Sequence, residues 1–136
     1  MSLQETKTGK KGITPDYKEK AEAPGLMEVK ALCNLLGEHK GSDVTALDLR
    51  KLQLWTDFFI IATVSSSTHL EGLLRHIKEF ASNEGFFIHR RTQKEDSGGW
   101  SLDDLGTVVI HLMTAQSREF YQLEELWGTA SRVPLK

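Results

Sequence analysis

The stretch WSLDDLGTVVIHLMTAQSREFYQLEELW, residues 100–127, carries the pattern that decides the fold of this chain. Two apolar runs, Trp100–Leu102 and Thr107–Met113, flank the turn-forming residues Asp103–Gly106. Strand formers on both sides of a short polar run with glycine are typical of a β-hairpin. The longer second run predicts that the second strand of this hairpin is buried.

The second half of the same stretch predicts an amphipathic helix, because apolar side chains recur at helical spacing. Thr114 or Ser117 can cap its first turn. Its inner face is predicted to consist of Phe120, Leu123, Leu126 and Trp127. The whole stretch contains neither a nucleophile–base pair nor a metal-ligand cluster, so it suits a binding surface better than an active site.

Upstream of the hairpin, three segments have clear patterns. Leu26 to about Glu38 has helical spacing and ends near two glycines. Val44–Leu49 alternates and is rich in strand formers, which predicts a strand. Phe58–Val64 is a continuous apolar run with β-branched and aromatic residues, as in a central strand that is covered on both faces.

A second amphipathic helix is predicted between this strand and the hairpin. Thr68 and Glu71 form a capping-box pattern, and the apolar stripe that follows ends at Gly85. Phe86–His89 is predicted as a short strand and Arg90–Gly99 as an exposed loop. The resulting order, α-β-β-α-β-β-β-α, predicts an α/β fold with a single mixed β-sheet and flanking helices.

The length of 136 residues is that of one domain. Residues 1–25 contain five lysines and few large apolar side chains, so we expect a disordered N-terminal tail. They lack the apolar core of a signal peptide. The α/β domain is predicted to occupy residues 26–130, and residues 131–136 are expected to form a C-terminal tail.

Composition excludes several classes of protein. The net charge of −2 argues against a general nucleic-acid binder, and no direct specific binding to nucleic acid is expected. No apolar run approaches the roughly 20 residues of a membrane span. The single cysteine, Cys33, cannot form an internal disulfide and lies in an apolar pattern, which favours a buried side chain and a cytoplasmic protein.

Metal-dependent catalysis is the alternative that the carboxylates raise. Asp48, Asp57, Asp103 and Asp104 could form a metal-binding set of the kind that nucleotidyltransferases use. Such enzymes have two aspartates separated by one residue on a strand, and this chain has no Asp-x-Asp. The five histidines lack metal-ligand spacing. We therefore expect no cofactor and no metal, and interpret Asp104 as a turn residue and His111 as a hydrogen-bonded structural histidine.

The charge of the C-terminal third favours a protein partner. Between residues 95 and 127 the only lysine or arginine is Arg118. The acidic residues there are Glu95, Asp96, Asp103, Asp104, Glu119, Glu124 and Glu125. An acidic face beside an exposed tryptophan suits a basic protein, and a plain solvated helix face is the alternative. Trp100, at the rim of the hairpin, is either a lid on the core or an anchor for a partner.

The order of these residues resembles the Iojap family, the ribosomal silencing factors (RsfS). The resemblance runs from about Leu26 to Trp127. In the hairpin and last helix it rests on Trp100, Asp104, Gly106, His111, Arg118, Tyr121, Leu123, Glu124, Leu126 and Trp127. Upstream it rests on residues 46–49, 56–63 and 65–70. The chain departs from the family pattern at Gln93-Lys94, where Glu-Gly is usual, and at Thr107, where Asp is usual.

This resemblance implies a nucleotidyltransferase-like α/β fold and a function that needs no catalysis. It implies a translation repressor that binds the large ribosomal subunit through its fourteenth protein, which is basic, and sterically blocks joining of the small subunit. The contact residues expected on this basis are Trp100, Leu102, Asp104, Leu105 and Met113. A metal-dependent nucleotidyltransferase-like enzyme, and a homodimer formed through the acidic hairpin face, are the alternatives.

Overall fold

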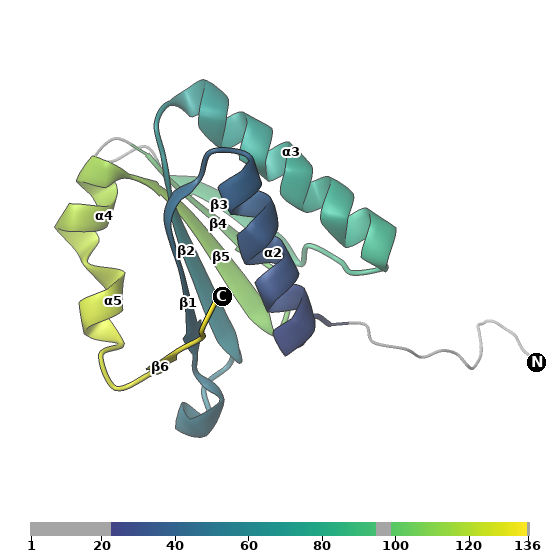
Figure 1. The fold of residues 1–136 in the computed structure, drawn as a ribbon, viewed down its shortest axis with the longest axis vertical. Helices are drawn as coiled ribbons and strands as arrows, with labels where there is room; N and C mark the ends of the chain where they lie inside the picture. The colour runs from purple at the N-terminus through teal and green to yellow at the C-terminus, as the bar shows by residue number, and fades with distance from the viewer. Residues whose placement is uncertain (1–22, 95–98, 136) are drawn as a thin grey trace, which may run out of the picture.

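The structure is a computed structural model that describes residues 23–94 and 99–135. Most of the predicted N-terminal tail, residues 1–22, lies outside the described residues, as does the loop segment 95–98. Among the described residues no helix is long and apolar enough to cross a membrane. The described part forms one mixed sheet with helices on both faces, which confirms the predicted α/β architecture (Figure 1).

The sheet has six strands in the order β3-β4-β5-β2-β1-β6. Their bounds are β1 Ser42–Asp48, β2 Phe58–Val64, β3 Arg90–Lys94, β4 Trp100–Asp104, β5 Val108–Thr114 and β6 Ser131–Arg132. The two central strands, β2 and β5, run parallel, and all other pairs are antiparallel. Both central strands are almost fully buried, as a continuous apolar run requires.

Helices α2 (Leu26–Glu38) and α3 (Ser67–Glu84) pack on one face of the sheet, and α4 (Ala115–Tyr121) and α5 (Leu123–Leu126) lie on the other (Figure 1). Because successive side chains of a strand point to opposite faces, β2 serves two cores. Phe58 and Ile60 pack with α2 and α3, whereas Phe59 and Ile61 pack toward α5. A 3₁₀ turn, η2 (Arg50–Leu52), joins β1 to β2.

The cap of α3 differs from the prediction. Ser66, and not Thr68, is the N-cap, and its Oγ accepts a hydrogen bond from the backbone N–H of His69 at 3.0 Å. Ser66 has extended backbone angles, which an N-cap needs, whereas Thr68 lies within the first turn. The helix ends at Gly85 as predicted, and this glycine has a left-handed φ of 81°.

The strand predicted at Phe86–His89 is wrong, because β3 begins only at Arg90. Phe86 is instead buried in the core beneath α3. The polar residues of β3, predicted as loop, pair with β4 at the edge of the sheet, where Arg90 and Gln93 remain exposed.

The last helix is broken, in contrast to the single helix that was predicted. Thr114 caps α4 by accepting a hydrogen bond from the N–H of Ser117 at 3.2 Å. At Gln122 the backbone is left-handed, with φ 48° and ψ 55°, and a separate short helix, α5, follows. Leu123 of α5 is buried in the second core, whereas Phe120 of α4 is 70% exposed and is not part of an inner face.

The segment predicted as a C-terminal tail also contributes to the fold. Ser131 and Arg132 form β6, which pairs with β1. Val133 is buried in the core beside α2, and its N–H donates to the carbonyl oxygen of Ala46 at 2.8 Å. The buried valine and the strand pairing together hold residues 131–133 against the domain, which a prediction from polarity and position missed.

Candidate partner-binding surface

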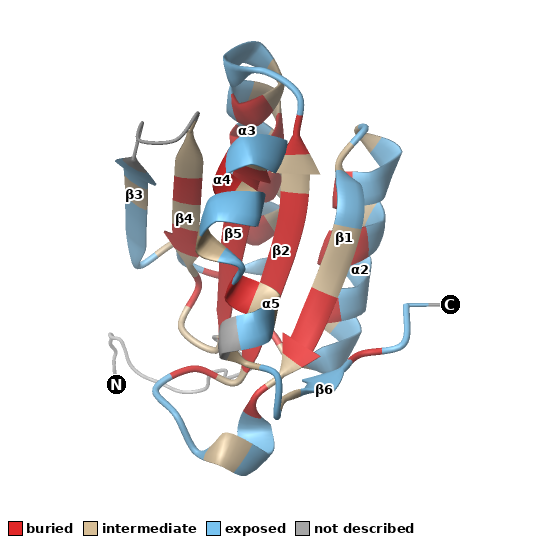
Figure 2. Ribbon diagram, turned by 90° about the vertical axis from the view of Figure 1, so that its left-hand side faces the viewer, coloured by how far each residue is buried: buried red, intermediate tan, exposed pale blue. Residues whose placement is uncertain are grey.

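Strand β4 places alternate side chains on the two faces of the sheet. Trp100 and Leu102 point to the face that carries α4 and α5, and both are partly exposed. Asp103 points to the opposite face and is buried. In Figure 2, β3 and β4 stand beside α4 and α5 and not beneath them. Trp100 and Leu102 are thus only partly covered, and we call Trp100, Leu102 and the neighbouring Tyr121 and Phe120 of α4 the aromatic patch.

Trp100 is partly buried: it contacts other side chains of the second core and is also partly accessible to solvent. Its indole N–H donates to Nδ1 of His111 at 3.2 Å. Its ring lies 4.5 Å from the ring of Tyr121 and 5.8 Å from that of His111, measured between centroids. The indole therefore packs on the second core while part of it stays accessible. Phe120, which sequence analysis assigned to the core, extends the patch through an edge contact with Tyr121 at 4.9 Å.

Two of the five predicted contact residues are buried and cannot touch a partner. Leu105 and Met113 are both 0% exposed. The Leu105 side chain packs in the core on the α2 and α3 face of the sheet. Its backbone N–H donates to the carbonyl oxygen of Val108 across the turn. Met113 lies on β5, directly opposite Trp100 in register, and supports the patch from below.

Asp104 has the turn role that the sequence predicted. Its Oδ1 accepts the N–H of Gly106 at 2.8 Å, while the residue remains partly exposed. Gly106 has a left-handed φ of 95°, and a Cβ there would lie 3.3 Å from the His89 ring. The turn thus requires glycine, and it fixes where the Asp104 carboxylate points.

The expected acidic face is smaller than the sequence implied. Asp103 is paired with Arg91 at 2.6 and 2.7 Å on the opposite face of the sheet. Glu124 is paired with Arg118. Strand β3 brings Arg90 into register with Asp104, so the hairpin carries both signs of charge. Glu95 and Asp96 lie outside the described residues.

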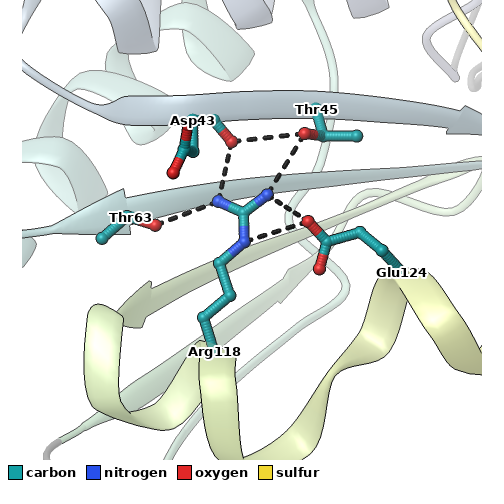
Figure 3. A network of polar contacts seen from close by, with 5 residues as sticks. All are labelled: Asp43, Thr45, Thr63, Arg118 and Glu124. Atoms are coloured by element: carbon teal, nitrogen blue, oxygen red, sulfur yellow. Dashed lines mark hydrogen bonds and ion pairs between the residues drawn. The ribbon is translucent and has the colours of Figure 1, made fainter.

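Arg118 holds the broken helix to the sheet (Figure 3). Its Nη1 donates to the Asp43 carbonyl oxygen at 2.7 Å and to Thr63 Oγ1 at 3.0 Å, and its Nη2 donates to Thr45 Oγ1 at 3.1 Å. Its Nε donates to Glu124 Oε2 at 3.1 Å. One guanidinium therefore joins α4, α5, β1 and β2. The sequence marked Arg118 as the one lysine or arginine of residues 95–127 and as part of the family pattern, but gave no sign of its partners on β1 and β2.

The pairing with Arg118 determines the charge of Glu124. Burial alone would raise the pKa of this carboxyl, but the hydrogen bond and the positive charge of Arg118 outweigh burial, and the pKa is lowered below its usual range. Glu124 is thus ionised at neutral pH inside a partly buried site. The pair is positioned to hold the α4–α5 break, which in turn places Tyr121 against Trp100.

His111 lies in the middle of β5 beneath the patch. It is 4% exposed, and among the described residues its Nε2 is a buried atom without a hydrogen-bond partner. Its ring meets the Phe59 ring edge-on at 4.8 Å. Burial lowers the pKa of His111 to about 4. At neutral pH the imidazole is therefore neutral, and its Nδ1 can accept the Trp100 N–H.

The aspartates of the alternative metal site do not converge. Asp48 ends β1 and Asp104 ends β4, and the order of strands places β5 and β2 between them. Three strand spacings amount to about 14 Å, far more than one metal ion can span. The Asp48 carboxylate is held by Arg50 at 2.7 and 3.0 Å. Within the described ranges no group of three potential ligands gathers around a common point.

The described residues form an α/β domain with a partly exposed aromatic patch where β4 adjoins α4. The family model described as "Ribosomal silencing factor during starvation", RsfS, matches residues 20–136. The ribosomal silencing factor RsfS of Halalkalibacterium halodurans is 33% identical over 103 residues, which are 76% of this chain and 87% of that protein. This chain therefore belongs to the RsfS family.

Two further comparisons agree with that assignment. A crystal structure of a Chromobacterium violaceum protein superimposes with a TM-score of 0.68 at 31% identity and covers 77% of this chain and 88% of that one. A mouse protein named mitochondrial assembly of ribosomal large subunit protein 1 is 27% identical over 108 residues, 76% of this chain. The match covers 46% of the mouse protein, so this chain spans about half of its length.

Proposed function

We propose that this protein is a cytoplasmic repressor of translation that binds the large ribosomal subunit and prevents the small subunit from joining. Membership of the RsfS family supports this proposal, and the mouse relative is named for assembly of the large subunit. The observation that carries the proposal is the aromatic patch, in which the partly exposed Trp100 and Leu102 of β4 adjoin Tyr121 and the exposed Phe120 of α4. When this protein is bound to the large subunit through the patch, it acts by occupying the space that the small subunit needs, so its action requires no catalytic residue.

The partner that we propose is the fourteenth protein of the large subunit, a basic protein. The contact surface consists of Trp100 and Leu102 as apolar anchors with Asp104 at the rim. Interfaces of this kind combine a few desolvated aromatic side chains with a polar border. Phe120 lies next to these anchors through Tyr121 and adds exposed apolar area to the same patch.

Co-sedimentation with isolated large subunits tests the proposal directly. The protein is expected to pellet with large subunits, and its addition before small subunits is expected to lower the fraction of complete ribosomes in a sucrose gradient. Small subunits alone provide the control and should leave the protein in the supernatant. Unimpaired joining by a protein that is bound to the large subunit would contradict the steric mechanism.

A second copy of the chain is the competing occupant of the same patch. If the patch forms a homodimer, sedimentation equilibrium of the free protein will report a mass that depends on concentration. Trp100→Ala would then abolish the dimer. A monomer at all concentrations, combined with binding to large subunits, supports the ribosomal partner.

Asp104→Lys is expected to slow association with the isolated ribosomal partner protein and weaken binding, because it places like charge against a basic surface. Raising the salt concentration should narrow the difference between variant and wild type, since exposed charges are screened over about 8 Å at physiological ionic strength. Surface plasmon resonance at two salt concentrations measures both effects.

Asp104→Asn provides the matched control for this charge reversal. An asparagine oxygen can still accept the Gly106 N–H, so the turn is retained while the charge is lost. We expect a smaller loss than for Asp104→Lys. Unchanged kinetics for a folded Asp104→Lys variant would move the interface away from this turn.

Deletion of residues 1–22 is expected to leave both the melting temperature and large-subunit binding nearly unchanged. The described chain is anchored just after this point, because the Thr107 hydroxyl donates to the Pro24 carbonyl oxygen at 2.5 Å. An aspartate at position 107, as is usual in the family, could not donate this bond when ionised. A strong loss of affinity would indicate that the N-terminal lysines contact ribosomal RNA.

A further inference from the structure

Trp100 makes a directional contact with the residue beneath it. An indole has a single hydrogen-bond donor, and that of Trp100 is directed at Nδ1 of His111 at 3.2 Å. The two residues are diagonal neighbours across the hairpin, since Trp100 is in register with Met113 and His111 with Leu102. Ring contact with Tyr121 limits the indole from the side of α4.

His111 is itself held in place on all sides. It is in register with Leu102 on β4 and with Ile61 on β2, and its ring meets the Phe59 ring edge-on. At 4% exposure the imidazole has little room to turn. The acceptor is thus a buried imidazole that lies directly beneath the partly exposed indole.

A neutral histidine at this position stabilises the folded state less than an apolar side chain would. The surrounding cluster is apolar, and Nε2 has no hydrogen-bond partner within the described part of the chain. A buried polar atom without a partner destabilises the folded state, whereas a leucine of similar volume would not. Among the described residues, the hydrogen bond that this imidazole makes is the one that it accepts from Trp100.

We propose that His111 is a positioning residue that holds the Trp100 indole in the orientation that binds the ribosomal partner. This inference rests on the proposed function, in which Trp100 is the anchor. Its physical basis is preorganisation, because an anchor whose rotamer is set before binding loses less conformational entropy in the complex. His111 acts only through Trp100 and does not reach the surface itself.

Two substitutions at this position separate positioning from stability. His111→Leu removes the acceptor and the unpartnered nitrogen together. It is expected to keep or raise the melting temperature and to weaken large-subunit binding about fivefold, the scale of ordering one side chain on binding. His111→Asn keeps an acceptor near the place of Nδ1, and should lower the melting temperature while binding stays within about twofold of wild type.

The orientation itself can be read without the ribosome. In a ¹⁵N-labelled sample the indole N–H resonance of Trp100 is assigned by its loss in Trp100→Phe. We expect this resonance to shift in His111→Leu toward that of a water-exposed indole and to stay close to its wild-type position in His111→Asn. The double variant Trp100→Phe with His111→Leu should bind no more weakly than Trp100→Phe alone, since the indole N–H is already absent.

The outcomes distinguish this inference from the proposed function. If Trp100→Ala binds large subunits as well as wild type does, the proposed anchor is wrong. If Trp100→Ala loses binding while His111→Leu retains it, or if the indole resonance does not move in His111→Leu, the positioning role is wrong and the proposed function stands. A melting temperature and an affinity that fall together in both His111 variants would also overturn the positioning role.

Discussion

Replacing Trp100 with alanine is expected to weaken binding to isolated large subunits about tenfold or more. A central aromatic anchor contributes roughly 2 kcal/mol or more, and 1.4 kcal/mol corresponds to a factor of ten. Trp100 also packs on His111 and Tyr121, so some loss of unfolding free energy will accompany the loss of binding. Titration of labelled protein with large subunits, at a temperature where the variant is fully folded, measures the effect.

Trp55 provides the matched control, because it is also a tryptophan and is 66% exposed. It precedes β2, at the opposite end of the strands from Trp100, about 16 Å along the sheet by strand rise. Trp55→Ala should therefore bind normally. Equal losses for the two variants would show that the effect is not specific to the aromatic patch, and the interface would have to be sought elsewhere.

The largest expected effect on stability is that of Arg118→Met. The guanidinium is 12% exposed, and its removal leaves the partly buried carboxylate of Glu124 without its cation and two threonine hydroxyls without their donor. Removing one partner of a buried ion pair typically costs about 3 kcal/mol or more. For a domain of this size that corresponds to a fall of roughly 10 °C in the melting temperature. Urea denaturation followed by circular dichroism tests this.

The pH dependence of the same variant has a definite sign. The pKa of Glu124 is lowered in the folded state, so the pairing stabilises the protein above the ordinary glutamate pKa of about 4.3 and is lost as pH falls through the lowered value. The difference in unfolding free energy between wild type and Arg118→Met should therefore be largest near pH 7 and narrow below about pH 4. A difference that stays constant with pH would assign the effect to packing of the arginine stem.

Glu124→Gln is the control for the charge. The amide oxygen can still accept from Arg118, and the other bonds of the guanidinium remain. We expect a smaller loss than for Arg118→Met. Arg118→Met should also weaken large-subunit binding, because Arg118 joins α4 to β1 and β2, and α4 carries the Tyr121 that packs on Trp100.

The elements whose patterns are local were predictable from the sequence. The predicted bounds of β2 agree with the structure, and those of α2 nearly do, because apolar periodicity and the glycines that end a helix act over a few residues. The order and spacing of the motif residues between Leu26 and Trp127 identified the family correctly. Asp104 was correctly interpreted as a turn residue, since its hydrogen bond reaches only to Gly106.

The composition of the candidate surface was decided by tertiary structure. Strand register and packing direct Leu105 and Met113 inward, and the way α4 packs on the sheet leaves Phe120 exposed. The polar strand β3 exists because β4 offers it backbone partners, which its own residues do not reveal. Arg118 finds its partners on β1 and β2, up to 75 residues away in the chain. The sequence alone determined which elements form and to which family they belong. The hydrogen bond from Trp100 to His111 depends on strand register and packing, which are set only when distant segments meet.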